Sequence, residues 1–282
     1  MSEAFDDVVD AHHHVWSLAR GDYGWLTPHL GVLYRDYDLD DYGAVVPQPV
    51  SGSVLVQAAP TMAETRFLLD VAKRSGGRVR AVVGWVDLDA DDAADALRAL
   101  AADPLLRGVR PMLQDLDDAE WILRPRVDAA LAAVAELGLA FDALVTPREL
   151  PAILRMLERH PRLRVVVDHG AKPGIAAGLR EPWATDLRAV ARHPNVHCKL
   201  SGLATEAMLD WRAATLRPYV EHLLDCFGTG RLMWGSDWPV VERGGGMERW
   251  WDATRALLAP LDGAAQAAIL AGNARRFYRF GR

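Results

Sequence analysis

Residues 8–16, VVDAHHHVW, decide the fold. A short apolar run, typical of a buried strand, ends here in three consecutive histidines, His12, His13 and His14. A doubly wound nucleotide-binding sheet usually carries a glycine-rich phosphate turn after its first strand. Histidines stand in that place instead, which favours a closed barrel over an open sheet.

After this strand, short β-branched runs alternate with longer helical patterns along the chain. Such alternation predicts βα units and a parallel sheet. Continuous apolar runs, such as residues 165–167, are typical of strands buried on both faces. We expect the strands at Val8–His14, Ser53–Gln57, Val79–Val86, Gly108–Pro111, Ala140–Ala143, Arg164–Asp168, Val196–Leu200 and Leu232–Ser236. Eight units in 282 residues indicate an α/β protein with a (β/α)8 TIM barrel, formed as a single domain over residues 1–282.

Helices are expected between these strands, and one of them is opened by Pro147 at a position that proline tolerates. The others are predicted at Thr61–Lys73, Asp91–Ala102, Arg126–Leu137, Thr185–Arg192, Trp211–Phe227 and Met247–Leu258. Two C-terminal helices, Gly263–Leu270 and Asn273–Phe280, complete the pattern. A long irregular stretch, Val15–Asp36, follows the first strand, and loops in this position build the catalytic face of a TIM barrel. We expect it to act as a lid.

Composition excludes several classes of protein. The formal net charge is −6 and no basic patch is visible, so nucleic acid is not an expected partner. No apolar run approaches the roughly 20 residues that cross a bilayer, and Met1–Asp7 lacks the apolar core of a secretory signal. The only cysteines, Cys198 and Cys226, form no disulfide framework and are expected to be inert buried thiols. A cytoplasmic protein is therefore expected.

Histidines and an aspartate stand at the ends of predicted strands. His12 and His14 share one face of the first strand because alternate residues of a strand point the same way, whereas His13 points to the other face. His169 ends the sixth strand and Asp237 the eighth. Imidazole is the commonest metal ligand, and a carboxylate can take a proton from water or bind a metal. We expect His12, His14, His169 and Asp237 to meet at the barrel mouth, although each pattern alone also fits an ordinary strand end or turn.

Three motifs resemble the amidohydrolase superfamily: residues 10–14 (DAHHH), 168–173 (DHGAKP) and 235–239 (GSDWP). The closest resemblance is to the amidohydrolase-2 branch of sugar-lactone and dicarboxylate-lactone hydrolases, in particular its L-fuconolactone and L-rhamnonolactone hydrolases. The resemblance runs nearly end to end and includes residues 84–87, 108–111, 199–202 and 272–274. It implies a hydrolase that adds water to an ester or lactone carbonyl.

By position, the resemblance implies that Asp237 is the general base, with His169 and Arg110 also catalytic. His12 and His14 would bind a metal or the substrate oxygens. Arg110 would hold a carboxylate or polarise the carbonyl, since a guanidinium forks onto oxygen pairs, although a structural ion pair is an alternative.

The chain departs from the superfamily pattern in two strands. Many members have a carbamylated lysine on strand four that bridges two metals, but this strand offers Arg110, and strand five offers Asp142 in place of a histidine. A two-metal site is therefore not expected. His12, His14, His169 and Asp237 would hold one Zn²⁺ or another divalent metal. Alternatively the enzyme is metal-independent, and Arg110 and the histidines stabilise the oxyanion.

Four further residues are weaker candidates for substrate binding. Trp25 and Trp85 lie near strand ends, where they would line a pocket or pack in the core. Gln57 would bind a substrate hydroxyl or cap backbone groups. Lys199 would face the site or pair with an acid.

The main functional prediction is a lactonase that opens the lactone ring of a sugar acid, an aldonolactone, with Asp237 as general base. The chain has no Gly-x-Ser-x-Gly elbow, which disfavours a serine hydrolase. A metal-dependent decarboxylase and a non-catalytic barrel that binds a sugar acid are the alternatives. The partner is a small-molecule lactone or sugar acid, and a monomer or homodimer is expected. The motifs name no particular lactone.

Overall fold

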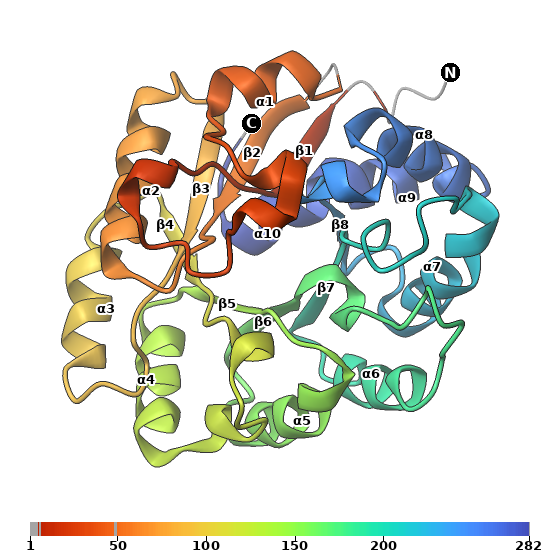
Figure 1. Cartoon of the computed structure of the whole chain (residues 1–282). Helices are drawn as coiled ribbons and strands as arrows, with labels where there is room; N and C mark the ends of the chain where they lie inside the picture. The colour runs from red at the N-terminus through yellow and green to blue at the C-terminus, as the bar shows by residue number, and fades with distance from the viewer. Residues whose placement is uncertain (1–4, 6, 48–49, 282) are drawn as a thin grey trace.

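The computed structural model describes residues 5, 7–47 and 50–281. Within them, eight parallel strands form one sheet in which each strand pairs with the next along the chain (Figure 1). The strands are β1 (Val8–His13), β2 (Val50–Val56), β3 (Val79–Gly84), β4 (Leu106–Val109), β5 (Ala140–Ala143), β6 (Arg164–Val167), β7 (Val196–Leu200) and β8 (Leu232–Trp234). Every predicted strand is present, with ends that differ by at most three residues.

Backbone hydrogen bonds beyond the end of β8 close the sheet onto β1. The Asp237 amide donates to the His12 carbonyl at 2.8 Å, and the His14 amide donates to the Trp238 carbonyl at 2.7 Å. The predicted TIM barrel is therefore confirmed. Its closure places residues that follow β8 directly beside the histidines of β1.

Helices surround the strands (Figure 1). They are α1 (Leu39–Val45), α2 (Met62–Arg74), α3 (Ala93–Ala101), α4 (Pro125–Glu136), α5 (Leu150–Arg159), α6 (Trp183–Ala191), α7 (Ala213–Phe227), α8 (Met247–Leu258), α9 (Gly263–Ala267) and α10 (Asn273–Tyr278). All the predicted helices are present. The C-terminal pair differs from the prediction because a π-helical turn, Ala268–Gly272, joins α9 to α10 without a break.

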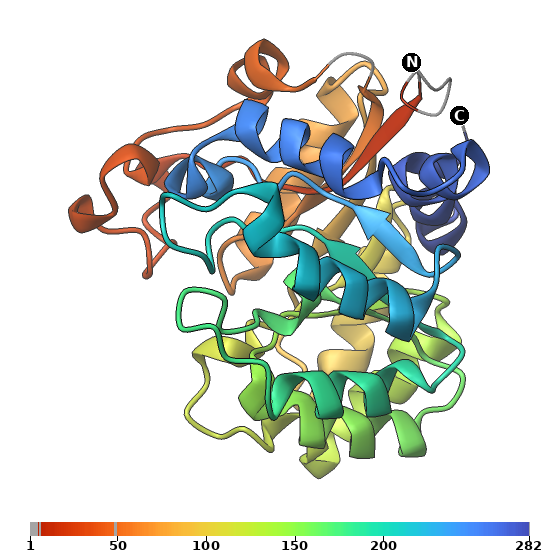
Figure 2. The same cartoon turned by 90° about the vertical axis from the view of Figure 1, so that its right-hand side faces the viewer.

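The expected long loop after β1 contains more local structure than the sequence predicts. Two 3₁₀ turns, Leu18–Arg20 and Pro28–Leu33, interrupt it, and α1 follows as a helix that was not predicted. Asp38 begins α1 by accepting hydrogen bonds from the amides of Asp40 and Asp41. Figure 2 shows the loop, in orange-red, on the side of the barrel opposite the dark blue C-terminal helices.

Two apolar clusters hold the barrel together. The larger one fills the space between the strands and the surrounding helices. The smaller one lies inside the barrel, where strand residues such as Val54 and Val166 join Phe277 and Tyr278 of α10. The Phe277 carbonyl accepts a hydrogen bond from Arg164 at the start of β6, so α10 closes the amino end of the barrel. The carboxyl end is left for the site. Within the described residues, no helix is both long and apolar enough to cross a membrane.

Candidate active site

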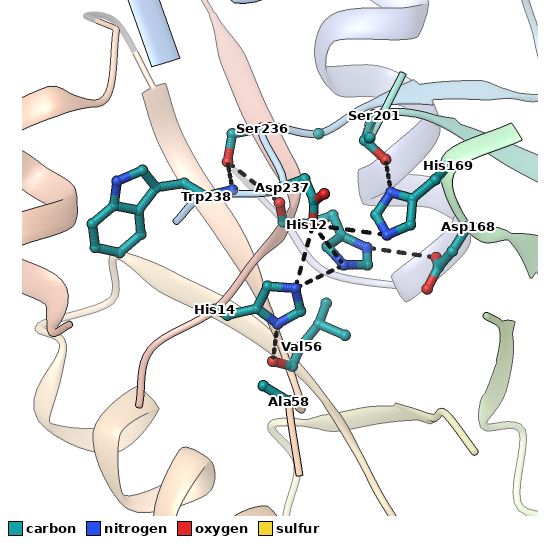
Figure 3. Close-up of polar contacts among 12 residues, drawn as sticks. His12, His14, Val56, Ala58, Asp168, His169, Ser201, Ser236, Asp237 and Trp238 are labelled. Carbon is teal, nitrogen blue, oxygen red and sulfur yellow. Dashed lines mark hydrogen bonds and ion pairs between the residues drawn. The ribbon is translucent and has the colours of Figure 1, made fainter. Parts of the chain in front are cut away.

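The two histidines predicted to share a face of β1 lie in contact. His12 and His14 approach to 3.2 Å between their Nε2 atoms (Figure 3). His13 points the other way, where its Nε2 lies 2.9 Å from the Ser53 hydroxyl and its ring stacks on Tyr42. The alternation of a strand therefore separates two site histidines from one structural histidine.

His169 and Asp237 reach the site through left-handed backbone, with φ of 54° and 59°. Residues other than glycine adopt this region at a cost of about 1–3 kcal/mol, so the surrounding packing must hold them there. Two glycines make room for the rings. A Cβ on Gly202 would lie 2.5 Å from Cγ of His169, and a Cβ on Gly235 would lie 2.8 Å from Cβ of His12.

Three imidazole nitrogens surround one carboxylate oxygen. Oδ1 of Asp237 lies 3.4 Å from Nε2 of His14 and 3.7 Å from Nε2 of both His12 and His169 (Figure 3). All four side chains are buried. The structure thus brings together the four residues that the strand ends single out, and their chemical roles stay predictions.

Hydrogen bonds to the far side of two rings fix their orientation. His14 donates from Nδ1 to the Val56 carbonyl at 2.8 Å, and Nδ1 of His169 lies 2.8 Å from the Ser201 hydroxyl. Because a carbonyl only accepts, His14 carries a hydrogen on Nδ1, and its Nε2 points toward Asp237. Metal-binding histidines in proteins are oriented in this way.

The donor set fits one divalent ion. Ligand atoms of His12, His169 and Asp237 all lie within 4.8 Å of one another, and His14 adjoins them. Imidazole nitrogens with a carboxylate oxygen are ligands that suit zinc. Arg110, the strand-four residue, offers no ligand to a second ion.

The electrostatics of the site favour neutral rings and an ionised carboxylate. Burial lowers the pKa of His14, and it lowers the pKa of His169 to about 4. Burial, together with the charge of Lys199, also lowers the pKa of His12 well below its ordinary value. Burial opposes the ionisation of Asp237, but His169 and His14 outweigh it and hold the pKa of this carboxyl below its ordinary value. Asp237 is therefore available near neutral pH as a base or a ligand.

Arg110 faces both the site and a structural partner. Its NH1 donates to Oδ2 of Asp168 at 3.2 Å and lies 3.4 Å from Nε2 of His12. Its NH2 donates to the Gln57 carbonyl. The ion pair proposed as the alternative for Arg110 is thus present, and the guanidinium also lines the catalytic hollow described next.

A hollow of about 290 Å³, here called the catalytic hollow, opens over these residues. Its lining includes His14, Arg110, His169, Lys172 and Asp237. Trp25 and Leu33 of the long loop after β1 also line it, and the Trp25 indole donates to the Ala58 carbonyl at 2.6 Å. The loop therefore forms part of the wall of the catalytic hollow, and its expected role as a lid stays a prediction.

Three weaker candidates lie elsewhere than in this hollow. The Gln57 amide is fully buried and donates to the Arg110 carbonyl at 2.6 Å, so Gln57 caps a backbone group. Lys199 is fully buried and pairs with Asp142 at 2.6 Å and Asp168 at 3.0 Å. Trp85 lines a neighbouring hollow instead. For Gln57 and Lys199, contacts with residues distant in the sequence hold the side chain away from the catalytic hollow.

Sequence reasoning missed several residues of the site. Ser201, which contacts His169, lies within a recognised motif but nothing in its spacing indicates that contact. Gln114 lines the hollow with its buried Oε1 lacking a hydrogen-bond partner among the described residues. Arg243 adds a second guanidinium to the lining, just before a glycine run that otherwise indicates only a flexible connection. Gln114 and Arg243 lie in the short 3₁₀ turns Leu113–Asp115 and Val240–Gly244, which are too short for a periodic pattern to indicate the direction of a side chain.

The barrel and its strand-end histidines define a protein of the amidohydrolase type. Residues 9–280 match the model of the amidohydrolase family, and the chain belongs to this family. It is 46% identical to an L-fucono-1,5-lactonase of Burkholderia ambifaria, over 97% of this chain and 96% of that one. A crystal structure of an amidohydrolase from Burkholderia multivorans with bound HEPES matches with a TM-score of 0.91, at 34% identity over 97% of this chain and 99% of that one. Another, with bound zinc, matches with a TM-score of 0.89 at the same identity and coverage.

Proposed function

We propose that this protein hydrolyses the lactones of sugar acids by water attack on the ester carbonyl. The observation that carries the proposal is the convergence of three histidines on Oδ1 of Asp237 at the mouth of the barrel. The likeness to an L-fucono-1,5-lactonase, at 46% identity over nearly the whole chain, supports the substrate class.

Asp237 acts as the general base. Its carboxylate lines the catalytic hollow and keeps its charge near neutral pH because the neighbouring imidazoles outweigh burial. It takes a proton from water as the water oxygen bonds to the lactone carbonyl carbon. The same proton then passes to the ring oxygen as the ester C–O bond breaks, which leaves the open-chain acid.

Positive charge around the hollow stabilises the oxyanion that forms on the carbonyl oxygen. Arg110 and Lys172 line the hollow with Asp237. Arg110 is held on two sides, by Asp168 and by the Gln57 carbonyl, so its guanidinium needs little reorganisation when the charge develops.

His12, His14, His169 and Asp237 would hold one divalent ion, for which zinc is the best-suited candidate. Support comes from the convergence of their ligand atoms, from the orientation of His14 and His169, and from the zinc in the Burkholderia multivorans structure. When bound, the ion would polarise the lactone carbonyl as a Lewis acid.

The first experiment measures proton release from a panel of five- and six-membered aldonolactones, before and after chelation, with bound metal counted in each sample. We expect hydrolysis of at least one six-membered aldonolactone. If chelation removes about one zinc per chain together with the activity, and added zinc restores the activity, the ion site is supported. Activity that survives chelation would assign catalysis to Asp237, Arg110 and the histidines alone.

Absence of hydrolysis across the panel, with or without zinc, would contradict the proposal. The decarboxylase alternative is tested in the same samples by CO₂ release from aromatic and unsaturated acids. The expected monomer or homodimer stays a prediction.

A further inference from the structure

Three tryptophans that are only half-buried line one hollow beside the catalytic hollow. They are Trp25 in the loop after β1, Trp85 directly after β3, and Trp121 between β4 and α4. By contrast Trp16, Trp183, Trp234, Trp238 and Trp250 are fully buried in the core. We call this space the distal hollow, and its volume is about 530 Å³.

The distal hollow adjoins the catalytic hollow. Trp25, Met112 and Asp115 line both. At about 290 Å³ the catalytic hollow lies at the small end of ligand pockets, the size for a single sugar ring. A substituent on that ring would pass over the shared wall into the larger space beside it.

The lining of the distal hollow combines aromatic faces with carboxylates. Trp85 and Trp121 are half-buried, and both line this hollow. Asp22, Asp87 and Asp115 stand among them. The C–H face of a sugar ring packs on an indole, whose π face is electron-rich, while sugar hydroxyls donate to carboxylates.

One carboxylate oxygen beside the distal hollow favours a sugar over a purely apolar group as the ligand. Oδ2 of Asp22 accepts from the Thr61 hydroxyl at 2.6 Å, but its Oδ1 is buried without a hydrogen-bond partner among the described residues. A buried polar atom without a partner is costly, and an apolar ligand would leave it unsatisfied. A ligand hydroxyl would supply the missing donor after the Asp22 side chain turns Oδ1 toward the hollow, while Oδ2 keeps its ion pair with Arg20 at 2.5 Å.

We propose that the distal hollow binds a second sugar ring, so that the protein accepts lactones of disaccharide acids, in which an aldonolactone carries a glycosyl group. The inference rests on the proposed function, because the first ring must occupy the catalytic hollow. The glycosyl ring lies against Trp85 and Trp121, and Asp22 accepts one of its hydroxyls.

The test compares kcat/KM for glucono-1,5-lactone with kcat/KM for cellobiono-1,5-lactone and lactobiono-1,5-lactone. In the unaltered protein we expect at least one disaccharide lactone to be the better substrate. In Trp121→Ala, kcat/KM for that disaccharide lactone should fall about tenfold relative to kcat/KM for glucono-1,5-lactone. A tenfold change corresponds to the free energy of one aromatic contact. Trp251→Ala is the matched control, since Trp251 is half-buried on α8 against Trp234, outside both hollows, and should leave the ratio unchanged.

Each outcome separates this proposal from the proposed function. If the protein hydrolyses glucono-1,5-lactone, but kcat/KM for both disaccharide lactones is lower in every variant, only the distal site is overturned. If 4-O-benzyl-glucono-1,5-lactone gains as much kcat/KM over glucono-1,5-lactone as the disaccharide lactone does, the site binds apolar groups and the sugar assignment is overturned. If no lactone is hydrolysed, the proposed function fails, and binding decides. Tryptophan fluorescence titrations with cellobionate and gluconate should then show tighter cellobionate binding that Trp121→Ala removes, and equal binding would overturn the inference.

Discussion

The ammonium nitrogen of Lys199 lies 3.0 Å from Nδ1 of His12, where neither side chain is exposed to solvent. The same ammonium group bonds Oδ2 of Asp142 at 2.6 Å and Oδ1 of Asp168 at 3.0 Å. The Tyr278 hydroxyl donates to Oδ2 of Asp142 at 2.7 Å. A single cation on β7 therefore joins a carboxylate of β5, and one directly after β6, to a ring of the candidate site.

Removing this cation should destabilise the protein. In Lys199→Met, Asp142 and Asp168 lose their shared partner inside the barrel, and breaking a buried pair costs about 3–5 kcal/mol. Urea unfolding measures the loss. The double variant Lys199→Met/Asp142→Asn removes one of the two stranded charges and should recover part of the stability. A single variant as stable as the unaltered protein would show that the network contributes nothing.

Replacing the proposed base should abolish most activity without disturbing the fold. Asp237→Asn keeps the shape of the side chain but cannot take a proton, so kcat on the best lactone should fall about 100-fold or more. Asp252→Asn, on the exposed face of α8, is the control and should retain full activity. Circular dichroism checks the fold of both. Full activity in Asp237→Asn would be incompatible with the mechanism.

The hydroxyl behind His169 should matter for metal affinity. In Ser201→Ala, Nδ1 of His169 loses its partner at 2.8 Å, and such changes weaken metal binding about 10–100-fold. Ser53→Ala is the matched control, because the Ser53 hydroxyl bonds His13, which points away from the site. Zinc affinity is measured by competition with a chromophoric chelator. Equal zinc affinity in the two variants would remove His169 from the ligand set.

Any residue larger than glycine at position 202 should impair the site. Its φ is +66°, and a Cβ there would lie 2.5 Å from Cγ of His169, so Gly202→Ala must displace the ring. Gly178 has the same φ of +66° with nothing within 4 Å of the added Cβ. Gly178→Ala therefore carries the same backbone strain, about 1–2 kcal/mol, without the clash. Because the backbone strain is the same, we expect Gly202→Ala and Gly178→Ala to have similar unfolding temperatures. Only Gly202→Ala should lose kcat/KM, by at least about tenfold.

Stability should depend on pH through Glu64 at the start of α2. Burial raises the pKa of Glu64 to about 7, although the amides of Ala58 and Ala59 donate to its carboxylate. The folded state therefore binds this proton more tightly than the unfolded state. The contribution is full below the ordinary pKa of 4.5 and is lost as the pH rises through 7.

We expect the free energy of unfolding to fall over this window by about 3 kcal/mol more in the unaltered protein than in Glu64→Gln, which cannot titrate. Urea unfolding from pH 4.5 to pH 8 gives both slopes. Parallel slopes would mean that Glu64 titrates alike in the folded and unfolded states.

The sequence predicts the features that depend on local pattern. Strand alternation is enough to separate His13 from His12 and His14, and strand ends are enough to bring Asp237 toward them. Contacts between distant residues are not predicted. Lys199 and Asp142 are 57 residues apart, and nothing in either strand indicates that they pair.

Loops set the second limit of prediction. The sequence leaves open whether Trp25 and Trp85 line a pocket or pack in the core. Both line a hollow, and the sequence does not show that there are two hollows. The assignment depends on how three loops lie beside one another, and loop conformation has no periodicity from which to predict it.

The position of Tyr278 sets an order on folding during synthesis. All eight strands leave the ribosome before α10, so a nascent chain can assemble the barrel wall while Asp142 still lacks the tyrosine hydroxyl. Arg164 at the start of β6 also lacks its hydrogen-bond acceptor until α10 is made, since it donates to the Phe277 carbonyl. The amino end of the barrel thus stays open until α10 has been translated. Until then, a chaperone that binds the nascent chain would meet a barrel whose amino end is still open.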